Sequence, residues 1–503
     1  MRDHDVIIIG SGMGGLVCGN LLSLEGLKVC VLEKNRQIGG CLQTYVRDRV
    51  IFDSGVHYLG GLNKGQNLYQ IFKYLDIIDK LKLQKMDEDV FDKILIENDD
   101  KEYVFAQGYE NFINKLLVDF PEEEQGLRAY CDKIKEVCSK FPIYNLRSGG
   151  ENHEKASVLE IDTKGFIESI TTNVRLREVL AGNNPLYAGM PDKTPFYVHA
   201  LILNSYIESS WKCIDGGSQI AKYLSRNILN RGGTIIRNRE VKKIIAEGGK
   251  ATSVELEDGS RMFANYIISN IPPVKTLEMT DTELIKRVYR NRLKSLENSI
   301  SCFTLNIVFK KDSYKYFKYN YYVFNEGCVW TTGNYTQDNW PLGYAVFVAA
   351  SSKSPDYADG MTVLAYMTYE EVKQWDHTRN TVSHMGERGE SYDSFKKRKA
   401  EVLLDNMERK FPGLRDHIKS YYTATPLSYR DYIGTDDGSL YGITKDYKDT
   451  LKTFISPRTK LPNLFFTGQN LNLHGVLGAA MSAIVTTNAL MGNDDIINKI
   501  RNA

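Results

Sequence analysis

The chain of 503 residues lacks a long apolar run and any excess of charge of one sign. No run approaches the roughly 18 continuous apolar residues of a membrane-spanning helix. Its 64 Lys and Arg residues balance 63 Asp and Glu residues, and this near-zero charge argues against nucleic acid as a partner. A composition of 42% hydrophobic and 25% charged residues is that of a folded globular chain. The length predicts two domains.

Metal-binding and disulfide patterns are also missing. The eight cysteines form no C-x-x-C pair and the eight histidines no H-E-x-x-H motif, so we expect neither a metal site nor a redox dithiol. Cysteines without a paired spacing are typical of proteins in a reducing compartment. Charged residues stand directly before the first short apolar run, unlike a signal peptide. We therefore expect a cytoplasmic protein.

A strand, a glycine turn, a helix and a second strand open the chain. The apolar run Val6–Ile9 predicts a buried parallel strand, and Gly10-Ser11-Gly12-Met13-Gly14-Gly15 follows it. In this context Gly-x-Gly-x-x-Gly predicts a dinucleotide site, in which helix N–H groups face the pyrophosphate. Glu33 ends the second strand, 27–32, where a carboxylate accepts hydrogen bonds from ribose hydroxyls. This pattern alone does not separate NAD from FAD.

Later patterns predict a helix over 68–83 and a mostly helical stretch through the following hundred residues. Asp258-Gly259 predicts a hairpin between strands 251–256 and 261–269. A second sheet is expected from strands 302–309, 321–324, 344–349 and 362–367. A polar loop over 375–399 leads into a helix that ends near residue 411, and a strand at 463–467 precedes a helix over 476–491.

Further glycine motifs carry a family resemblance. Gly39-Gly40 is followed by Thr44 and by Asp53-Ser54-Gly55-Val56-His57-Tyr58, and the C-terminal part contains Phe466-Thr467-Gly468 and His474-Gly475-Val476-Leu477-Gly478. These motifs resemble the flavin-containing amine oxidase and phytoene desaturase superfamily, and specifically its branch of carotenoid isomerases and retinol saturases. The resemblance extends over nearly the whole chain.

The resemblance implies an α/β (mixed α+β), two-domain FAD/NAD(P)-binding Rossmann-type fold of the glutathione reductase-like class. Residues 1–75, 205–280 and 425–503 would form the FAD domain, and 76–204 and 281–424 an inserted substrate domain. Val241 matches the position whose backbone holds the adenine in the family. The expected cofactor-binding residues are Gly10, Ser11, Gly12, Met13, Gly14, Gly15, Glu33, Lys34, Gly39, Gly40, Thr44, Gly55, Val56, His57, Val241, Asn270, Gly468, Gly475, Val476 and Gly478.

A physical argument supports the last of these motifs. Gly475 and Gly478 open a helix without bulky side chains, so its N–H groups can face a flavin ring, and a positive helix end stabilises an anionic reduced flavin. The alternative is an ordinary packing helix rich in Gly and Ala. No cysteine or histidine lies in a recognised flavin-attachment motif, so we expect noncovalent FAD, with NAD(P)H as a possible electron donor.

The resemblance implies redox chemistry on carbon–carbon bonds of an apolar polyene, retinoid or isoprenoid-like substrate, as a saturase or desaturase. The alternatives are flavin-dependent cis–trans isomerisation, amine oxidation, and a non-enzymatic escort that binds prenyl groups. His57, Tyr58 and His474 are the expected catalytic residues, with Tyr206 and Glu208 as further candidate proton donors. His199 and Tyr206 are expected to contact substrate. Peripheral membrane contact is a further expectation, although Lys396–Lys399 and the helix over 68–83 fit a solvated face and a core helix better.

Overall fold

The computed structural model describes residues 4–148, 152–382 and 385–503. Its first sheet is a parallel layer in the order β10-β2-β1-β13, with β19 paired to β13. The strands are β1 (His4–Ile9), β2 (Val29–Leu32), β10 (Thr234–Ile236), β13 (Arg261–Ser269) and β19 (Leu464–Phe466). Segments from both ends of the chain thus form one Rossmann-type sheet, as predicted.

Three helices cover this sheet. α1 (Met13–Leu24) packs between α9 (Ser218–Asn230) and α16 (Gly475–Met491). Cys18 in α1 and Cys30 in β2 are fully buried apolar-core residues. β12 (Lys250–Leu256) pairs antiparallel with the first half of β13, which confirms the predicted hairpin across Asp258-Gly259, and β11 (Val241–Glu247) pairs with the other edge of β12.

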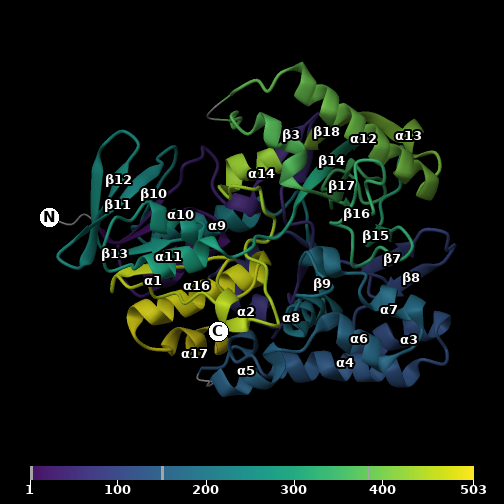
Figure 1. Cartoon of the computed structure of the whole chain (residues 1–503), viewed down its shortest axis with the longest axis horizontal. Coiled ribbons are helices and arrows are strands. Elements are labelled where there is room, and N and C mark those ends of the chain that lie inside the picture. The colour runs from purple at the N-terminus through teal and green to yellow at the C-terminus, as the bar shows by residue number, and fades with distance from the viewer. Residues whose placement is uncertain (1–3, 149–151, 383–384) are drawn as a thin grey trace.

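The second sheet forms the other half of the molecule, to the right of the first sheet in Figure 1. Its order is β18-β14-β17-β16-β15-β7-β8. The strands are β7 (Asp92–Ile96), β8 (Glu102–Phe105), β14 (Ser301–Phe309), β15 (Asn320–Phe324), β16 (Gly343–Val348), β17 (Gly360–Met367) and β18 (Ile418–Ala424). Four of them are the predicted strands.

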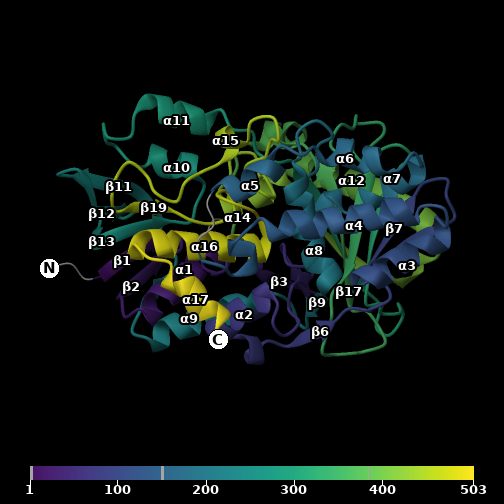
Figure 2. The ribbon, with the colours of Figure 1, turned by 90° about the horizontal axis from the view of Figure 1, so that it is seen from below.

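Alternate residues of this sheet face two different cores. Tyr322, Phe324 and Phe347 pack on helices α3 (Tyr109–Asp119), α4 (Glu124–Ser139) and α8 (Phe196–Glu208), which Figure 2 shows across one face. Tyr321 and Val323 point to the opposite face, where α12 (Glu390–Lys410) covers the strands.

Two small sheets lie between these layers: β3 (Thr44–Arg47) with β4 (Val50–Asp53), and β5 (Leu59–Gly60) with β9 (Ser210–Cys213) and β6 (Leu83–Lys85). The remaining helices are α2 (Asn67–Tyr74), α5 (Asn152–Leu159), α6 (Thr163–Ile170), α7 (Val174–Leu180), α10 (Pro273–Glu278), α11 (Arg287–Lys294), α13 (Leu414–His417), α14 (Pro426–Ile433), α15 (Thr450–Thr453) and α17 (Asp495–Arg501). No helix of the described ranges is long and apolar enough to cross a bilayer.

The structure corrects two sequence predictions. The helix expected over 68–83 ends at Tyr74, because Asp76 adopts a left-handed φ of 56°, which helices exclude. Its apolar residues are nevertheless buried, as a core helix predicts. The stretch expected to be mostly helical also contains β7 and β8, and the helix after the polar loop already begins at Glu390.

Candidate functional site

A cavity of about 830 Å³ opens at the carboxyl ends of β1 and β2. This edge of a parallel sheet is where α/β folds bind ligands. Sixteen of the predicted cofactor residues line it: Gly10, Ser11, Gly12, Met13, Gly14, Glu33, Lys34, Gly39, Gly40, Gly55, Val56, Val241, Asn270, Gly468, Gly475 and Val476. Segments far apart in the sequence therefore meet around one elongated site.

The glycines allow close backbone approach at this site. A Cβ on Gly14 would lie 2.6 Å from Asn270 Oδ1 and 2.9 Å from Gly468 Cα. A Cβ on Gly15 would lie 2.2 Å from the Gly10 carbonyl oxygen, so this residue serves helix–strand packing rather than the cavity wall. Gly475 has a φ of 75° and nothing within 4 Å of its Cβ position. The cradle and its size fit a dinucleotide such as FAD.

Glu33 is buried at the cavity edge and organises the glycine turn. Its Oε2 accepts hydrogen bonds from the Ser11 backbone N–H at 3.0 Å and from the Ser11 hydroxyl at 2.6 Å. Its Oε1 accepts the Asn35 backbone N–H at 2.8 Å. The carboxylate thus links the end of β2 to the turn before α1.

A charged cluster, of which the sequence analysis identified only Lys34, borders the same cavity. Asp431 in α14 accepts hydrogen bonds from Arg430 and Arg379, at 2.7 and 3.2 Å, and from Arg388. The Lys34 ammonium donates to the Asp431 carbonyl oxygen at 3.1 Å, and burial lowers its pKa. The two arginines beyond α14 and the Arg430–Asp431 pair lie in segments without a motif, so no local sequence signal indicated them.

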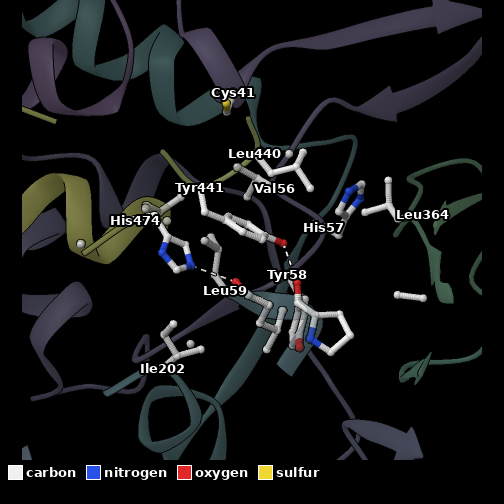
Figure 3. A pocket seen from close by; sticks show the side chains of 18 of the residues that line it. Cys41, Val56, His57, Tyr58, Leu59, Ile202, Leu364, Leu440, Tyr441 and His474 are labelled. Carbon is white, nitrogen blue, oxygen red and sulfur yellow. Dashed lines mark hydrogen bonds between the residues drawn. The ribbon is translucent and has the colours of Figure 1, made fainter. Parts of the chain in front are cut away.

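An apolar cavity of about 200 Å³ adjoins the first (Figure 3). The two cavities share Cys41, Gly55, Val56, Gly475 and Val476 in their walls. The second wall is aromatic and aliphatic, and none of its described residues carries a charged side chain. It includes Leu59, Leu186, Ile202, Tyr322, Phe347, Leu364, Tyr366, Tyr429, Leu440 and Tyr441. Such a wall suits an apolar ligand.

Both candidate histidines line the apolar cavity, in an uncharged state. The His57 ring stacks on Phe347 at 4.4 Å and has no hydrogen-bond partner among the residues that the structure describes. His474 Nε2 lies 2.8 Å from the Leu186 carbonyl oxygen, so this nitrogen carries a proton and donates it. Burial lowers the pKa of each histidine to about 4. His474 therefore also orients the cavity wall at Leu186.

Tyr58 and Tyr206 meet in the same wall, with their rings stacked at 4.3 Å. The Tyr58 hydroxyl donates to Asp92 Oδ2 at 3.0 Å and lies 2.7 Å from the Tyr322 hydroxyl. Asp92 is fully buried, and burial raises its pKa to about 7. Sequence reasoning missed Asp92, because its burial arises from the pairing of β7 with β15.

Four predicted site residues lie elsewhere. His199 lines neither cavity: it is buried between the hydroxyls of Tyr130 and Tyr187, at 2.5 and 2.8 Å, and burial lowers its pKa to about 3. Gly15 and Thr44 line neither cavity, and the Thr44 hydroxyl donates to Ser218 at 3.0 Å. Glu208 also lies outside both walls. His57 and Gly478 border the apolar cavity rather than the larger one.

Comparison with known proteins supports the same architecture. Residues 8–75 match the family model of the NAD(P)-binding Rossmann-like domain. The chain is 25% identical to the all-trans-retinol 13,14-reductase of Rattus norvegicus, over 97% of the chain and 85% of that protein. It is 24% identical to prolycopene isomerase 2 of an Oncidium hybrid cultivar, over 96% and 83%. A solved oxidoreductase from Methanosarcina mazei shares the fold, with a TM-score of 0.65 and 16% identity over 95% of this chain and 99% of that one.

Proposed function

We propose that this chain is an FAD-dependent oxidoreductase that saturates or desaturates a carbon–carbon bond of an apolar polyene, retinoid or isoprenoid-like substrate. One observation carries the proposal: an uncharged aromatic cavity opens onto a glycine-lined dinucleotide cavity at Gly55–Val56 and Gly475–Val476. A bound flavin would supply two-electron hydride chemistry at that junction. The similarity to retinol reductases, over nearly the full chain, supports a polyene substrate.

The cavity wall favours this function over amine oxidation and over a prenyl-binding escort. An amine substrate binds as a cation, yet the described wall contains no carboxylate to pair with it. A prenyl escort has no use for a cofactor, whereas the glycine turn, Glu33 and Gly475 all border one large cavity. Cis–trans isomerisation is the second candidate, supported by the similarity to prolycopene isomerase.

This chain's own residues would exclude water and position the substrate. Leu59, Leu186 and Phe347 give the cavity its dry wall, and Tyr206 contacts substrate there. His474, bonded to Leu186, holds the wall, whereas the His57 ring leaves its nitrogens available to the cavity. We retain both histidines and Tyr58 as the groups that handle protons.

The test is an anaerobic single turnover. Purified protein loaded with FAD is reduced by dithionite, NADH or NADPH and mixed with all-trans-retinol. A saturase reoxidises the flavin and yields a product two hydrogens heavier, whereas an isomerase yields a product of unchanged mass. Failure to bind FAD, or a flavin that neither retinol nor an all-trans or cis carotenoid affects, contradicts the proposal. Reduction by NADPH or NADH identifies the electron donor.

We also propose a peripheral membrane contact, at a face formed by α11 and α15. Val288, Leu451 and Phe454 expose 81%, 82% and 52% of their surface there. Arg292 joins the two helices by donating to the Lys452 and Phe454 carbonyl oxygens at 3.0 and 3.3 Å. Exposed Lys286, Arg287 and Lys452 flank the apolar side chains, a combination that suits an anionic lipid surface. An apolar substrate partitions into such a surface.

A further inference from the structure

A buried hydrogen-bond chain lies behind the apolar cavity. The Tyr58 hydroxyl is 3.0 Å from Asp92 Oδ2 and 2.7 Å from the Tyr322 hydroxyl. Both tyrosines line the cavity, whereas Asp92 is fully buried behind them at the start of β7. The Tyr58 side chain thus stands between Asp92 and the cavity.

The surroundings of Asp92 are arranged to hold a carboxylate. Asn320 Nδ2 donates to Oδ1 at 2.8 Å, and Asn183 Nδ2 donates to Oδ2 at 2.9 Å. The amide oxygens of both asparagines are buried and have no partner among the described residues. Leaving a buried acceptor unpaired costs free energy. Because both asparagines leave their amide oxygens unpaired, the hydrogen bonds from their amino groups to Asp92 must offset that cost.

A buried lysine completes this arrangement. Lys212 in β9 is fully buried, donates to the Val348 carbonyl oxygen at 2.9 Å and interacts electrostatically with Asp92. Burial lowers the lysine pKa to about 7 and raises the pKa of Asp92 to about 7. Both groups thus exchange protons near neutral pH, where an ordinary carboxyl and an ordinary ammonium do not.

We propose that Asp92 supplies, through the Tyr58 hydroxyl, the proton that reduction of a carbon–carbon double bond in the cavity consumes. This inference rests on the proposed function and names the proton donor for it. Tyr58 would be the catalytic residue, since it lines the cavity and its hydroxyl contacts Asp92. Asp92 and Lys212 would act through it as positioning residues.

Atoms and electrons balance in this step. A reduced flavin held in the adjoining cavity would supply the hydride that forms a C–H bond at one carbon, and it would itself be oxidised by two electrons. The electron pair left on the neighbouring carbon forms a C–H bond with the Tyr58 proton. With Asp92 protonated and the Tyr58 hydroxyl, which otherwise donates to Asp92 Oδ2, turned toward the substrate, the Tyr58 oxygen takes the Asp92 proton in turn. The negative charge ends on Asp92, beside the two amide donors and Lys212.

This transfer avoids a buried phenolate. Burial and the nearby Asp92 hold the pKa of Tyr58 well above its ordinary value, so a lone phenolate there would be unfavourable. The neighbouring ionisable groups do not compete as charge acceptors: His57 has its pKa lowered to about 4, and burial raises the pKa values of Tyr206 and Tyr322. The amide donors and Lys212 make Asp92 the group that stabilises the charge.

The test compares Tyr58→Phe and Asp92→Asn with Asp53→Asn as a matched control. Asp53 is a second buried carboxyl whose pKa burial raises to about 7, but it accepts the Gly217 backbone N–H at 2.7 Å and borders neither cavity. The first readout needs no substrate: the infrared C=O band of protonated carboxyls in the FAD-loaded protein. We expect Asp92→Asn to remove a component that fades as pH rises through about 7, and Asp53→Asn to remove a different one.

The second readout is reoxidation of reduced flavin by all-trans-retinol in H₂O and D₂O. We expect Tyr58→Phe and Asp92→Asn to bind FAD normally and slow this step by roughly 10²–10⁴, the loss typical of a general acid. The solvent isotope effect should differ from the wild-type value in the slow variants, in which the proton comes from another source, and keep that value in Asp53→Asn. The wild-type rate should also decline as pH rises through about 7, because the donor is the neutral carboxyl.

The outcomes separate this inference from the function on which it rests. Wild-type flavin that neither retinol nor a carotenoid affects contradicts the proposed function, and the relay with it. Reoxidation at the wild-type rate in both variants overturns the relay alone, as does an infrared spectrum that Asp92→Asn leaves unchanged. Tyr58→Phe keeps the ring that stacks on Tyr206, so it remains decisive should Asp92→Asn fail to fold.

Discussion

The Glu33 carboxylate holds Ser11 by two hydrogen bonds, to its backbone N–H at 3.0 Å and to its hydroxyl at 2.6 Å. The acid at the end of β2 therefore stabilises the glycine turn itself, in addition to bordering the cavity. A ribose hydroxyl would have to share this carboxylate with Ser11. If FAD binds here, Glu33 would have two roles, to shape the turn and to accept from the ligand.

We expect Glu33→Ala to lower FAD affinity about ten- to hundredfold, since it removes charge-assisted hydrogen bonds worth about 1.5–3 kcal/mol. Glu33→Gln retains one acceptor oxygen for Ser11 and should lose less. Fluorescence titration of the apoprotein with FAD measures both. Equal affinity in all three proteins would show that the acid contributes to neither the turn nor the ligand.

The cofactor should be released intact on denaturation. Cys41 is the cysteine at the junction of the two cavities, and burial raises the pKa of its thiol to about 11. Thiolate is the form that would attack a flavin, so little of it is present at neutral pH. Acid or heat treatment followed by filtration should place FAD in the filtrate. Flavin that stays with the precipitated wild-type chain but is released from Cys41→Ser would contradict this expectation.

Gly15→Ala tests the close packing of α1 on β1. The added Cβ would lie 2.2 Å from the Gly10 carbonyl oxygen, a backbone atom that cannot rotate away. We expect a loss of about 1–3 kcal/mol in the free energy of unfolding, as is usual for overpacked sites, with weaker FAD binding as the turn shifts. In the control Gly333→Ala, the new Cβ meets only the flexible end of Ile300, at 3.1 Å. Equal urea midpoints for the two variants would refute the packing argument.

A feature of this protein could be predicted from the sequence where residues close to one another in the chain determine it. The opening strands and the helix between them were predicted correctly, because residues close to one another in the sequence determine them. The glycine turn and Glu33 lie at the carboxyl ends of these strands, where the motif places them. His474 and Gly475 were identified through a motif. The hydrogen bond between His474 and Leu186 could not be predicted, because 288 residues separate the two in the sequence.

The Asp92 site was not predictable in this way. Its contacts come from Tyr58, Asn183, Lys212 and Asn320, which lie far apart in the sequence. Of these four, Tyr58 alone belongs to a motif that the sequence analysis identified. An Asp at the start of a short strand ordinarily indicates a surface turn. Only the pairing of β7 with β15 reveals that it is buried.

The face formed by α11 and α15 predicts lipid binding. Val288→Asp and Leu451→Asp place a charge where apolar side chains would enter the bilayer, so each should reduce sedimentation with vesicles that contain phosphatidylserine. Val118→Asp changes an equally exposed residue, 78%, on the distant helix α3 and serves as control. Equal sedimentation of all variants would show that another face, or none, contacts lipid.

Stability should fall on acidification because buried histidines stay neutral in the folded chain. Burial lowers the pKa of His474 to about 4, below the ordinary value of 6.5. As pH falls below 6.5, the unfolded chain therefore binds a proton at this position while the folded chain does not, and the free energy of unfolding decreases until about pH 4. Between about pH 7 and about pH 5 the loss from one such residue is roughly 2 kcal/mol.

His474→Gln, which retains an N–H donor for Leu186, should remove this contribution, so its urea midpoint should decline less with acid than that of wild type. The exposed His377 offers the control His377→Gln, whose pH dependence should follow wild type. A wild-type slope in His474→Gln would mean that the histidine takes up its proton in the folded protein as readily as in the unfolded one. His474 would then be able to carry a positive charge beside the cavity, and its role would change from a fixed donor to Leu186 into an acid available to the substrate.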